Sequence, residues 1–249
     1  MSQSQTLGAL RELKLHGMAE ALERQFGSPQ LQADGFDERF GMLVDAERLA
    51  RDNRRLARLL KLAKLKLNAC AEDIDYRASR GIDRHQVNRL LGCDWIMQHQ
   101  NLIITGPTGA GKTWLACAFG HQAARRGLPV WYRRLPRLLE ELEIAREAGH
   151  LPALRAQLAR AKLLVLDDWG VAPLGRRGRQ DLLEVIDDRV NSGSVAITSQ
   201  LPISEWHAYL GEPTIADAIL DRIVHSAHRI QLQGESMRKL KTSSPAAGR

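Results

Sequence analysis

The sequence predicts an α/β domain with three layers, a parallel sheet between two layers of helices, preceded by an all-helical N-terminal region. Three observations lead to this prediction. Apolar residues in the N-terminal region recur at helical spacing, which is typical of amphipathic helices. From residue 101 onward, short apolar runs alternate with helical stretches, as in a parallel sheet with crossover helices. A glycine-rich loop follows the first of these runs, where such sheets bind phosphate groups.

Length and composition favour one main domain with a smaller appendage. The chain has 249 residues, of which 44% are hydrophobic and 26% charged, and this balance excludes a largely disordered chain. The net charge of +7 favours an acidic partner such as nucleic acid. The spacing of the three cysteines matches neither a zinc motif nor a disulfide framework. Without a secretion signal or a long apolar run, we expect a cytoplasmic protein that does not contact membranes.

Two helical stretches are expected before residue 70. Between residues 6 and 26 the apolar side chains recur at three- and four-residue steps, which predicts one short amphipathic helix or two. A Gly-Ser-Pro sequence ends this stretch, because these residues favour turns over helices. A second helix is expected from near residue 36 to about residue 67.

The second helix carries a strongly positive segment. Between residues 48 and 66 it holds eight Lys and Arg against one Asp, and the helical period brings most of them to one broad face. Because acidic partners are almost absent, we expect these cations to be free for DNA phosphates, and the lack of aromatic residues favours contacts that are independent of base sequence. A solvated helix face is the alternative. The predicted contacts, called the basic stripe below, are Arg48, Arg51, Arg54, Arg55, Arg58 and Lys61.

The remaining elements are expected in the following order. Residues 71–100 are expected to form a linker that docks on the next domain, with a short helix near 83–91. Helices are then expected after the glycine-rich loop to about residue 126, at 135–148 and at 180–191. The expected strands are 102–104, 130–132, 163–166 and 195–197.

The glycine-rich loop has the full P-loop pattern. It reads Gly106-Pro107-Thr108-Gly109-Ala110-Gly111-Lys112-Thr113 and matches GxxxxGK[ST] at every fixed position. In this pattern the glycines allow backbone N–H groups to surround the phosphates, the lysine contacts the β- and γ-phosphates, and the hydroxyl binds Mg²⁺. We therefore expect all eight residues to bind ATP, with Lys112 also acting in catalysis and Thr113 as a metal ligand.

Two carboxylates follow the third expected strand. Asp167 and Asp168 come directly after an apolar run, so they are expected at the sheet edge that the P-loop occupies. Asp167 is expected to hold Mg²⁺ through water, and Asp168 to orient or deprotonate the attacking water. Just beyond, a compact cationic loop is expected to touch DNA, with a solvated loop as the alternative. Its cations are Arg176, Arg177 and Arg179.

Several stretches together resemble the IstB-like transposition helper proteins, which are AAA+ ATPases related to the DnaC-type helicase loaders. The resemblance covers nearly the whole chain. The P-loop is generic, whereas the Asp-Asp-Trp-Gly, Ile-Leu-Asp-Arg and Gly-Glu-Ser-Met-Arg sequences are more specific. The matching stretches are LKLHGMAEALERQ, DAERLARDNRRLARLLKLAKLK, LIITGPTGAGKTWLA, KLLVLDDWGVAPL, VAITSQLPISEW, AILDRIVHSAH and GESMRK.

The resemblance implies roles for further residues. Residues 198–200 end the strand that carries the γ-phosphate sensor in this family, which implies Ser199 and Gln200 as nucleotide contacts. Arg222 stands where such ATPases place the arginine finger that reaches a neighbouring subunit's γ-phosphate; a surface arginine is the alternative. Arg238 corresponds to a second sensor that contacts the nucleotide in its own subunit.

Together, the resemblance and the charge pattern predict an ATPase that assembles with ATP and Mg²⁺ on duplex DNA as a homo-oligomer and recruits or activates a cognate transposase. Hydrolysis of ATP to ADP and phosphate is expected to be slow and DNA-stimulated, since Asp168 is one methylene shorter than the Glu usual at its position. The alternatives are a helicase loader, a small-molecule P-loop kinase and a nucleotide-switched binding module. The expected parts are a helical DNA-binding and self-association region (1–70), the linker (71–100), the ATPase domain (101–241) and a disordered tail (242–249).

Overall fold

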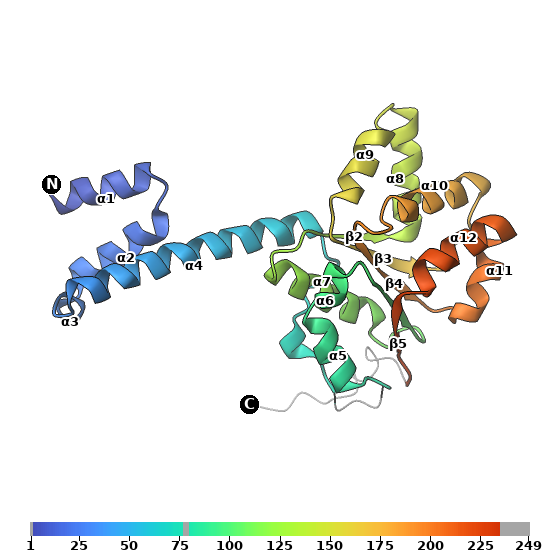
Figure 1. Ribbon diagram of the computed structural model, residues 1–249, viewed down its shortest axis with the longest axis horizontal. Coiled ribbons are helices and arrows are strands. Elements are labelled where there is room, and N and C mark those ends of the chain that lie inside the picture. The colour runs from blue at the N-terminus through green and yellow to red at the C-terminus, as the bar shows by residue number, and fades with distance from the viewer. Residues whose placement is uncertain (1, 77–79, 235–249) are drawn as a thin grey trace, which may run out of the picture. The chain divides into compact units, whose positions relative to one another are not determined.

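The computed structural model describes residues 2–76 and 80–234. The chain divides into two compact units, one ending at Arg58 and the other beginning at Leu59 (Figure 1). This division falls inside a helix and earlier than the expected boundary at residue 70. The reason is that the last turn of that helix belongs to the second unit, where Ala63 is fully buried in the core. The expected disordered tail lies outside the described residues.

The first unit is helical, as the apolar spacing predicts. Its elements are α1 (Gln3–Glu12), α2 (His16–Gly27), α3 (Pro29–Gln32) and most of α4 (Phe36–Ala63). Ser2 and Gln5 form a capping box at the start of α1. α2 has no side-chain cap of its own, and Glu47 on α4 replaces it by accepting hydrogen bonds from the backbone N–H groups of Gly17 (2.7 Å) and Met18 (3.2 Å). α4 ends before the expected residue 67, because Lys64 takes a left-handed conformation with φ of 50°.

The second unit is built on one parallel sheet of five strands in the order β2-β3-β4-β1-β5. All four neighbouring pairs are parallel. The strands are β1 (Asn101–Thr105), β2 (Val130–Arg134), β3 (Leu163–Trp169), β4 (Ser194–Ser199) and β5 (Ala227–Gln231). β3 lies between β2 and β4, so residues at the ends of these three strands can meet at one edge of the sheet.

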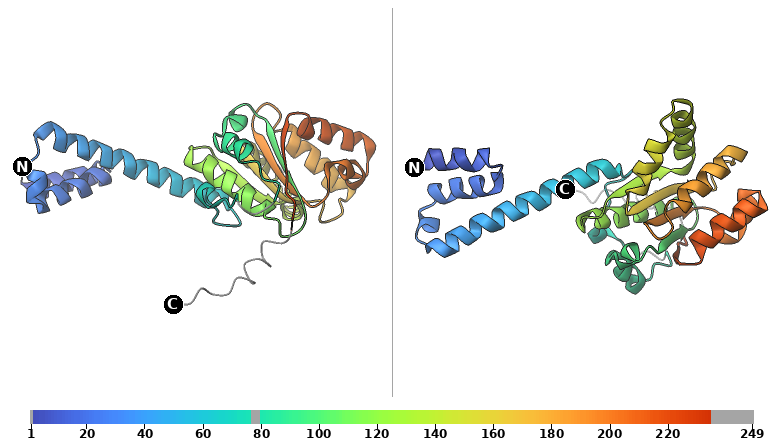
Figure 2. Two further views of the ribbon diagram at one scale, coloured as in Figure 1. Left: turned by 90° about the horizontal axis from the view of Figure 1, so that it is seen from below. Right: turned by 45° about the horizontal axis from the view of Figure 1, so that its top comes forward.

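Helices cover both faces of the sheet (Figures 1 and 2). One face packs on α5 (Arg84–Leu91), α6 (Asp94–Met97) and α7 (Lys112–Arg125). The other packs on α8 (Leu135–Glu147), α9 (Leu151–Ala159), α10 (Arg176–Asp187), α11 (Trp206–Leu210) and α12 (Pro213–Val224). Successive residues of β1 alternate between the two cores, with Leu102 and Ile104 in one and Ile103 in the other. The expected three-layer α/β fold with a helical N-terminal region is confirmed.

The structure corrects some expected elements. α10 begins at Arg176 and ends at Asp187, so the expected cationic loop is the first turn of a helix. The short helices α3 and α6, the helices α9, α11 and α12, and the edge strand β5 were not expected. β5 reads AHRIQ and buries a single side chain, so it lacks the apolar run that marks the other strands. None of the described helices is long and apolar enough to cross a membrane.

Candidate functional site

The P-loop connects β1 to α7 in a conformation that requires its glycines. Gly106 and Gly111 have φ angles of 148° and 98°, a region that other residues rarely adopt. A Cβ atom on Gly106 would also lie 2.5 Å from the carbonyl oxygen of Leu232. Gly111 is the N-cap of α7, and the first N–H groups of a helix have no partner within it. The loop therefore offers backbone N–H groups at the positive end of a helix dipole, which suits a phosphate group.

Lys112 is the first residue of α7 and folds back over the loop. Its Nζ donates hydrogen bonds to the carbonyl oxygens of Gly106 (2.7 Å) and Pro107 (2.8 Å). Burial lowers the pKa of this ammonium, against the opposing effect of the Asp167 and Asp168 carboxylates. Neutral carbonyls are weak partners for a buried cation, so a phosphate group that enters the loop can replace them.

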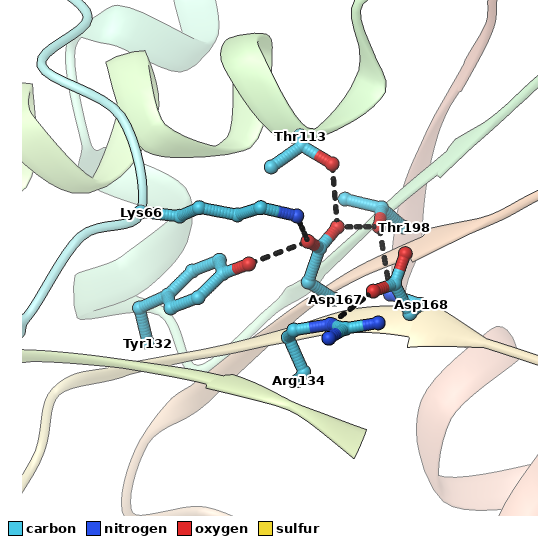
Figure 3. A network of polar contacts seen from close by, with 7 residues as sticks. All are labelled: Lys66, Thr113, Tyr132, Arg134, Asp167, Asp168 and Thr198. Atoms are coloured by element: carbon cyan, nitrogen blue, oxygen red, sulfur yellow. Dashed lines mark hydrogen bonds and ion pairs between the residues drawn. The ribbon is translucent and has the colours of Figure 1, made fainter. Parts of the chain in front are cut away.

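Asp167 lies at the C-terminal end of β3 and is completely buried (Figure 3). Its Oδ1 accepts hydrogen bonds from the hydroxyls of Thr113 (2.8 Å) and Thr198, and its Oδ2 accepts one from Tyr132 (2.5 Å). Burial alone would raise the pKa of Asp167. The hydrogen bonds and the nearby Lys66 ammonium outweigh burial and hold this pKa below its ordinary value. The carboxylate is therefore charged at neutral pH and oriented by three hydroxyls.

Asp168 is displaced from the regular strand. The pairing of β3 with β4 is irregular between Leu166 and Trp169, and Asp168 has a left-handed φ of 63°. Its N–H donates to the Thr198 hydroxyl (3.3 Å). Its Oδ2 accepts a hydrogen bond from Nε of Arg134, at the end of β2 (2.5 Å). β3 therefore continues through both carboxylates, although the strand was expected to end at residue 166. The ion pair between Asp168 and Arg134 was not expected from the sequence.

A cavity of about 550 Å³ lies over the P-loop, and a cavity of this volume suits a small-molecule ligand. Thr108, Lys112 and Thr113 line it together with Asp168 and Gln200. Asp167 does not, because it is buried behind Thr113. The P-loop and the carboxylate pair therefore meet at one site, as their positions in the sequence imply.

Of the two residues implied as γ-phosphate sensors, one lines the cavity and the other does not. Gln200 lines the cavity and accepts a hydrogen bond from the Thr108 hydroxyl (2.7 Å). Ser199 is buried, donates to the carbonyl oxygen of Trp169 (2.8 Å) and accepts from the N–H of Leu201 (3.0 Å), so it does not reach the cavity. Alternation along β4 explains the difference, since it directs Thr198 toward Asp167 and Ser199 to the opposite face. The nucleotide contact implied for Ser199 does not fit this geometry.

The two implied arginines lie away from the cavity or outside the described residues. Arg222 on α12 pairs with Asp187 at the end of α10 and donates a hydrogen bond to the carbonyl oxygen of Ala218 (2.8 Å). Its expected surface partner Asp221 is not used, and Arg222 is not among the residues that line the cavity. Arg238 lies outside the described residues.

The basic stripe lies on α4, but not all of its cations are free. Glu47, one residue before the positive segment, pairs with Arg51 (2.7 Å) and Arg54 (3.3 Å). The expectation that every cation lacks an acidic partner is therefore wrong for these two. Their side chains remain 60% and 49% exposed, so both can still reach solvent. The hydrogen bond from Arg51 is the largest of the effects that hold the pKa of Glu47 below its ordinary value.

The cations expected in a loop after β3 occupy the first turn of α10 instead. Arg176 and Arg177 are exposed, whereas Arg179 is partly buried. A cluster of cations at a helix N-terminus opposes the helix dipole, which makes this turn electrostatically unfavourable unless an anion is near. No sequence pattern marked Tyr132, Arg134 or Lys66 as partners of the two carboxylates, and the fold brings them there from distant segments.

A P-loop that opens a helix, opposed by a buried carboxylate on the third strand of a parallel sheet, defines a P-loop nucleotide-binding protein of the AAA+ class. The crystal structure of the DnaC helicase loader has this fold: it is 19% identical, with a TM-score of 0.56 over 68% of this chain and 99% of that one. Within the class, the chain belongs to the IstB-like ATP-binding protein family, whose model matches residues 8–246.

Relatives in this family are similar over most of their length. The insertion sequence ATP-binding protein y4pL of Sinorhizobium fredii is 48% identical, covering 94% of this chain and 96% of the relative. The ATP-binding protein of insertion sequence IS1162 from Pseudomonas fluorescens is 52% identical, covering 82% of this chain and 89% of the relative. The resemblance to the IstB-like family that the sequence motifs indicated is therefore confirmed.

Proposed function

We propose that this chain is an ATPase that helps an insertion sequence to transpose, by assembling with ATP and Mg²⁺ on duplex DNA and recruiting or activating the transposase. The observation that carries the proposal is the buried Asp167 carboxylate, hydrogen-bonded to the P-loop Thr113 at 2.8 Å. Membership of the IstB-like family and the names of its relatives, which are insertion sequence ATP-binding proteins, support the biological setting.

The residues of the site fit a nucleotide and a divalent cation. The P-loop N–H groups and Lys112 would bind the phosphates, after Lys112 leaves the carbonyl oxygens of Gly106 and Pro107. Thr113 and, through water, Asp167 would hold Mg²⁺, which neutralises charge on the phosphates when bound. The Thr113 hydroxyl donates a hydrogen bond to Asp167, so the lone pairs of its oxygen remain free to bind a cation.

Hydrolysis requires a change at Asp168. Its Oδ2 is engaged by Arg134 at 2.5 Å, so this oxygen is not free to bind a water molecule. We propose that Asp168 orients or deprotonates the attacking water once Arg134 has turned away, and the exposed position of Arg134, 53% by its side chain, permits this movement. Slow hydrolysis by the isolated protein follows from this arrangement.

The remaining parts of the proposal concern assembly. Arg222 is proposed to leave Asp187 and act on the nucleotide of a neighbouring subunit, since it does not reach the cavity of its own chain. The basic stripe on α4 is proposed to contact DNA phosphates, with self-association also assigned to the helical region. The transposase is proposed to supply the DNA-cutting chemistry.

The test is assembly on DNA. Long duplex DNA with Mg²⁺ and a non-hydrolysable ATP analogue should convert the wild-type protein into a rapidly sedimenting nucleoprotein complex. Lys112→Ala should abolish both analogue binding and this complex, because it removes the cation of the P-loop. Lys162→Ala, at an exposed lysine away from the cavity, is the matched control and should behave as wild type.

Each result discriminates between functions. Wild-type assembly on DNA in the Lys112→Ala variant would contradict the proposal. A clear preference for single-stranded DNA would favour a helicase loader instead. Phosphorylation of a small molecule by a monomer that ignores DNA would favour a kinase.

A further inference from the structure

Lys66 reaches the site from outside the P-loop and the sheet. It lies in the segment 64–70, called the connector below, which follows the end of α4 at Ala63. Its Nζ is 3.6 Å from Oδ2 of Asp167 (Figure 3). Among the described residues it is the only cation within ion-pair distance of this carboxylate, whose other partners are neutral hydroxyls. The connector therefore supplies the positive charge opposite the proposed magnesium ligand.

The connector is packed against α7, so the position of Lys66 is not that of a loose surface lysine. Leu65 lies against Gly120 of α7 so closely that a Cβ there would be 2.9 Å from a methyl carbon of Leu65. Ala63 and Ala69, on either side of Lys66 in the sequence, are buried in the same core as Cys117, one turn further along α7 from Thr113. Both Lys66 and Leu67 line the cavity over the P-loop. The backbone is thus held while the Lys66 side chain, 41% exposed, can move.

Of the partners of Asp167, Lys66 is the one that a bound cation can replace. Thr113, Thr198 and Tyr132 donate hydrogen bonds from inside the protein, where all three oxygens face the carboxylate. A buried carboxylate requires a positive partner to offset its loss of hydration. A divalent cation near Thr113 and Asp167 would supply that charge and would repel an ammonium group held beside the same carboxylate. Only the partly exposed Lys66 can withdraw into water at little cost.

We propose that Lys66 is the counter-ion of Asp167 in the metal-free site and releases this carboxylate when Mg²⁺ and nucleotide bind. The inference rests on the proposed function, because it takes the P-loop cavity as a Mg²⁺–ATP site. Two residues separate Lys66 from Ala63, the last helical residue of α4. Release of Lys66 therefore removes one of the contacts that hold the connector, directly beyond the helix that carries the basic stripe, and links occupancy of the nucleotide site to the end of that helix.

The test measures how nucleotide binding depends on Mg²⁺. A fluorescent non-hydrolysable ATP analogue is bound to wild type, Lys66→Met and Lys66→Arg over a series of Mg²⁺ concentrations and in excess chelator. Lys66→Met keeps the length of the side chain and removes the competing charge, so the Mg²⁺ concentration for half-maximal binding should fall by about threefold to tenfold, in line with a partly exposed ion pair. Lys66→Arg should stay close to wild type. Lys64→Met, at an exposed neighbouring lysine, controls for the loss of one positive charge.

A second measurement uses the unchanged protein. Hydrogen exchange of the connector amides in wild type should become faster with Mg²⁺ and the analogue together than with the analogue in chelator. An unchanged Mg²⁺ midpoint in Lys66→Met, or connector exchange that ignores Mg²⁺, would overturn the inference while leaving the proposed function standing. Equal weakening of binding with and without Mg²⁺ would also overturn it, because Lys66 would then be a phosphate contact. Failure of wild type to bind the analogue at all would contradict both.

Discussion

The backbone of Asp168 restricts which residue can replace it. A left-handed φ of 63° is strained for most side chains, and asparagine and aspartate tolerate it best. Glutamate would carry the carboxylate further but lacks this tolerance. The conformation therefore makes asparagine the cleanest probe of the carboxylate charge, because it preserves both shape and backbone.

We predict that Asp168→Asn binds the ATP analogue as wild type does and loses ATP turnover by about a hundredfold or more, since general base catalysis contributes effects of this size. Complexes on DNA should persist longer with ATP. Steady-state phosphate release and analogue binding check this, with the exposed Asp221→Asn as control. Unchanged turnover would move the catalytic role to another group.

At the scale of single residues, the site residues that could be predicted are those that belong to a local sequence motif. The P-loop and the carboxylates could be predicted because their chemistry depends on neighbours in the sequence. Tyr132, Thr198 and Lys66 could not, since each meets Asp167 only because β2 and β4 flank β3 and the connector crosses α7. Strand order is not encoded in any short pattern, so contacts between strands become visible only in the fold.

Within α4, the ion pairs of Glu47 divide the basic stripe into two classes. Arg51 and Arg54 are bound to a carboxylate that also caps α2. To contact phosphate they must first give up that partner, whereas Arg48 and Arg58 lie outside these ion pairs. The same helix therefore contains cations that stabilise the first unit and cations that are better placed for DNA.

We predict that replacing Arg48 and Arg58 by Gln reduces the slope of log affinity for duplex DNA against log salt by up to about 1.8, at roughly 0.9 for each phosphate contact. The matched pair of changes at Arg51 and Arg54 should reduce the slope less and should lower the melting temperature more. Titrations at several salt concentrations and thermal unfolding separate the two effects. An unchanged slope in both double variants would show that the stripe is a solvated face.

Elements with a continuous apolar run or a strong helical period could be predicted, and elements without one could not. β1 and β3 are buried on both faces, and each contains an unbroken apolar run, residues 102–104 in β1 and 163–166 in β3. β5 lies at the sheet edge and has only Ala227 and Ile230 as apolar residues, with His228 and Arg229 between them, so no apolar run or alternation marks it before the fold is known. The start of α10 was missed because Arg176 and Arg177 look like a loop, while the helix is fixed by burial of Leu182, Val185 and Ile186.

At the scale of the whole molecule, the proposed shared site requires two chains. Arg222 is predicted to act only across a subunit interface, so Arg222→Ala should bind ATP almost as wild type does and hydrolyse it poorly. Mixing it with Lys112→Ala, which is inactive for a different reason, should restore part of the DNA-stimulated ATPase activity. An interface in the mixture can combine an intact P-loop from one chain with an intact arginine from the other.

The mixing experiment with Arg222→Ala and Lys112→Ala requires three controls. Each variant alone should remain inactive at the total concentration used for the mixture, and sedimentation must show that the two variants enter the same complex. Asp187→Asn breaks the ion pair of Arg222 within the chain and should leave hydrolysis intact or raise it. Co-assembly without recovered activity would count against a shared site.

The last turn of α4 belongs to the second unit, which decides where the two units can be separated by proteolysis or truncation. Ala63 is buried in the core of the second unit, and Leu65 packs against Gly120 of α7. An isolated fragment of the second unit that begins at residue 71 would lack these side chains and expose the apolar surface that they cover, which favours aggregation. A cleavage site placed ahead of Leu59, where the second unit begins, would keep these contacts, so we expect the second unit to be purified by itself only with the end of α4 attached.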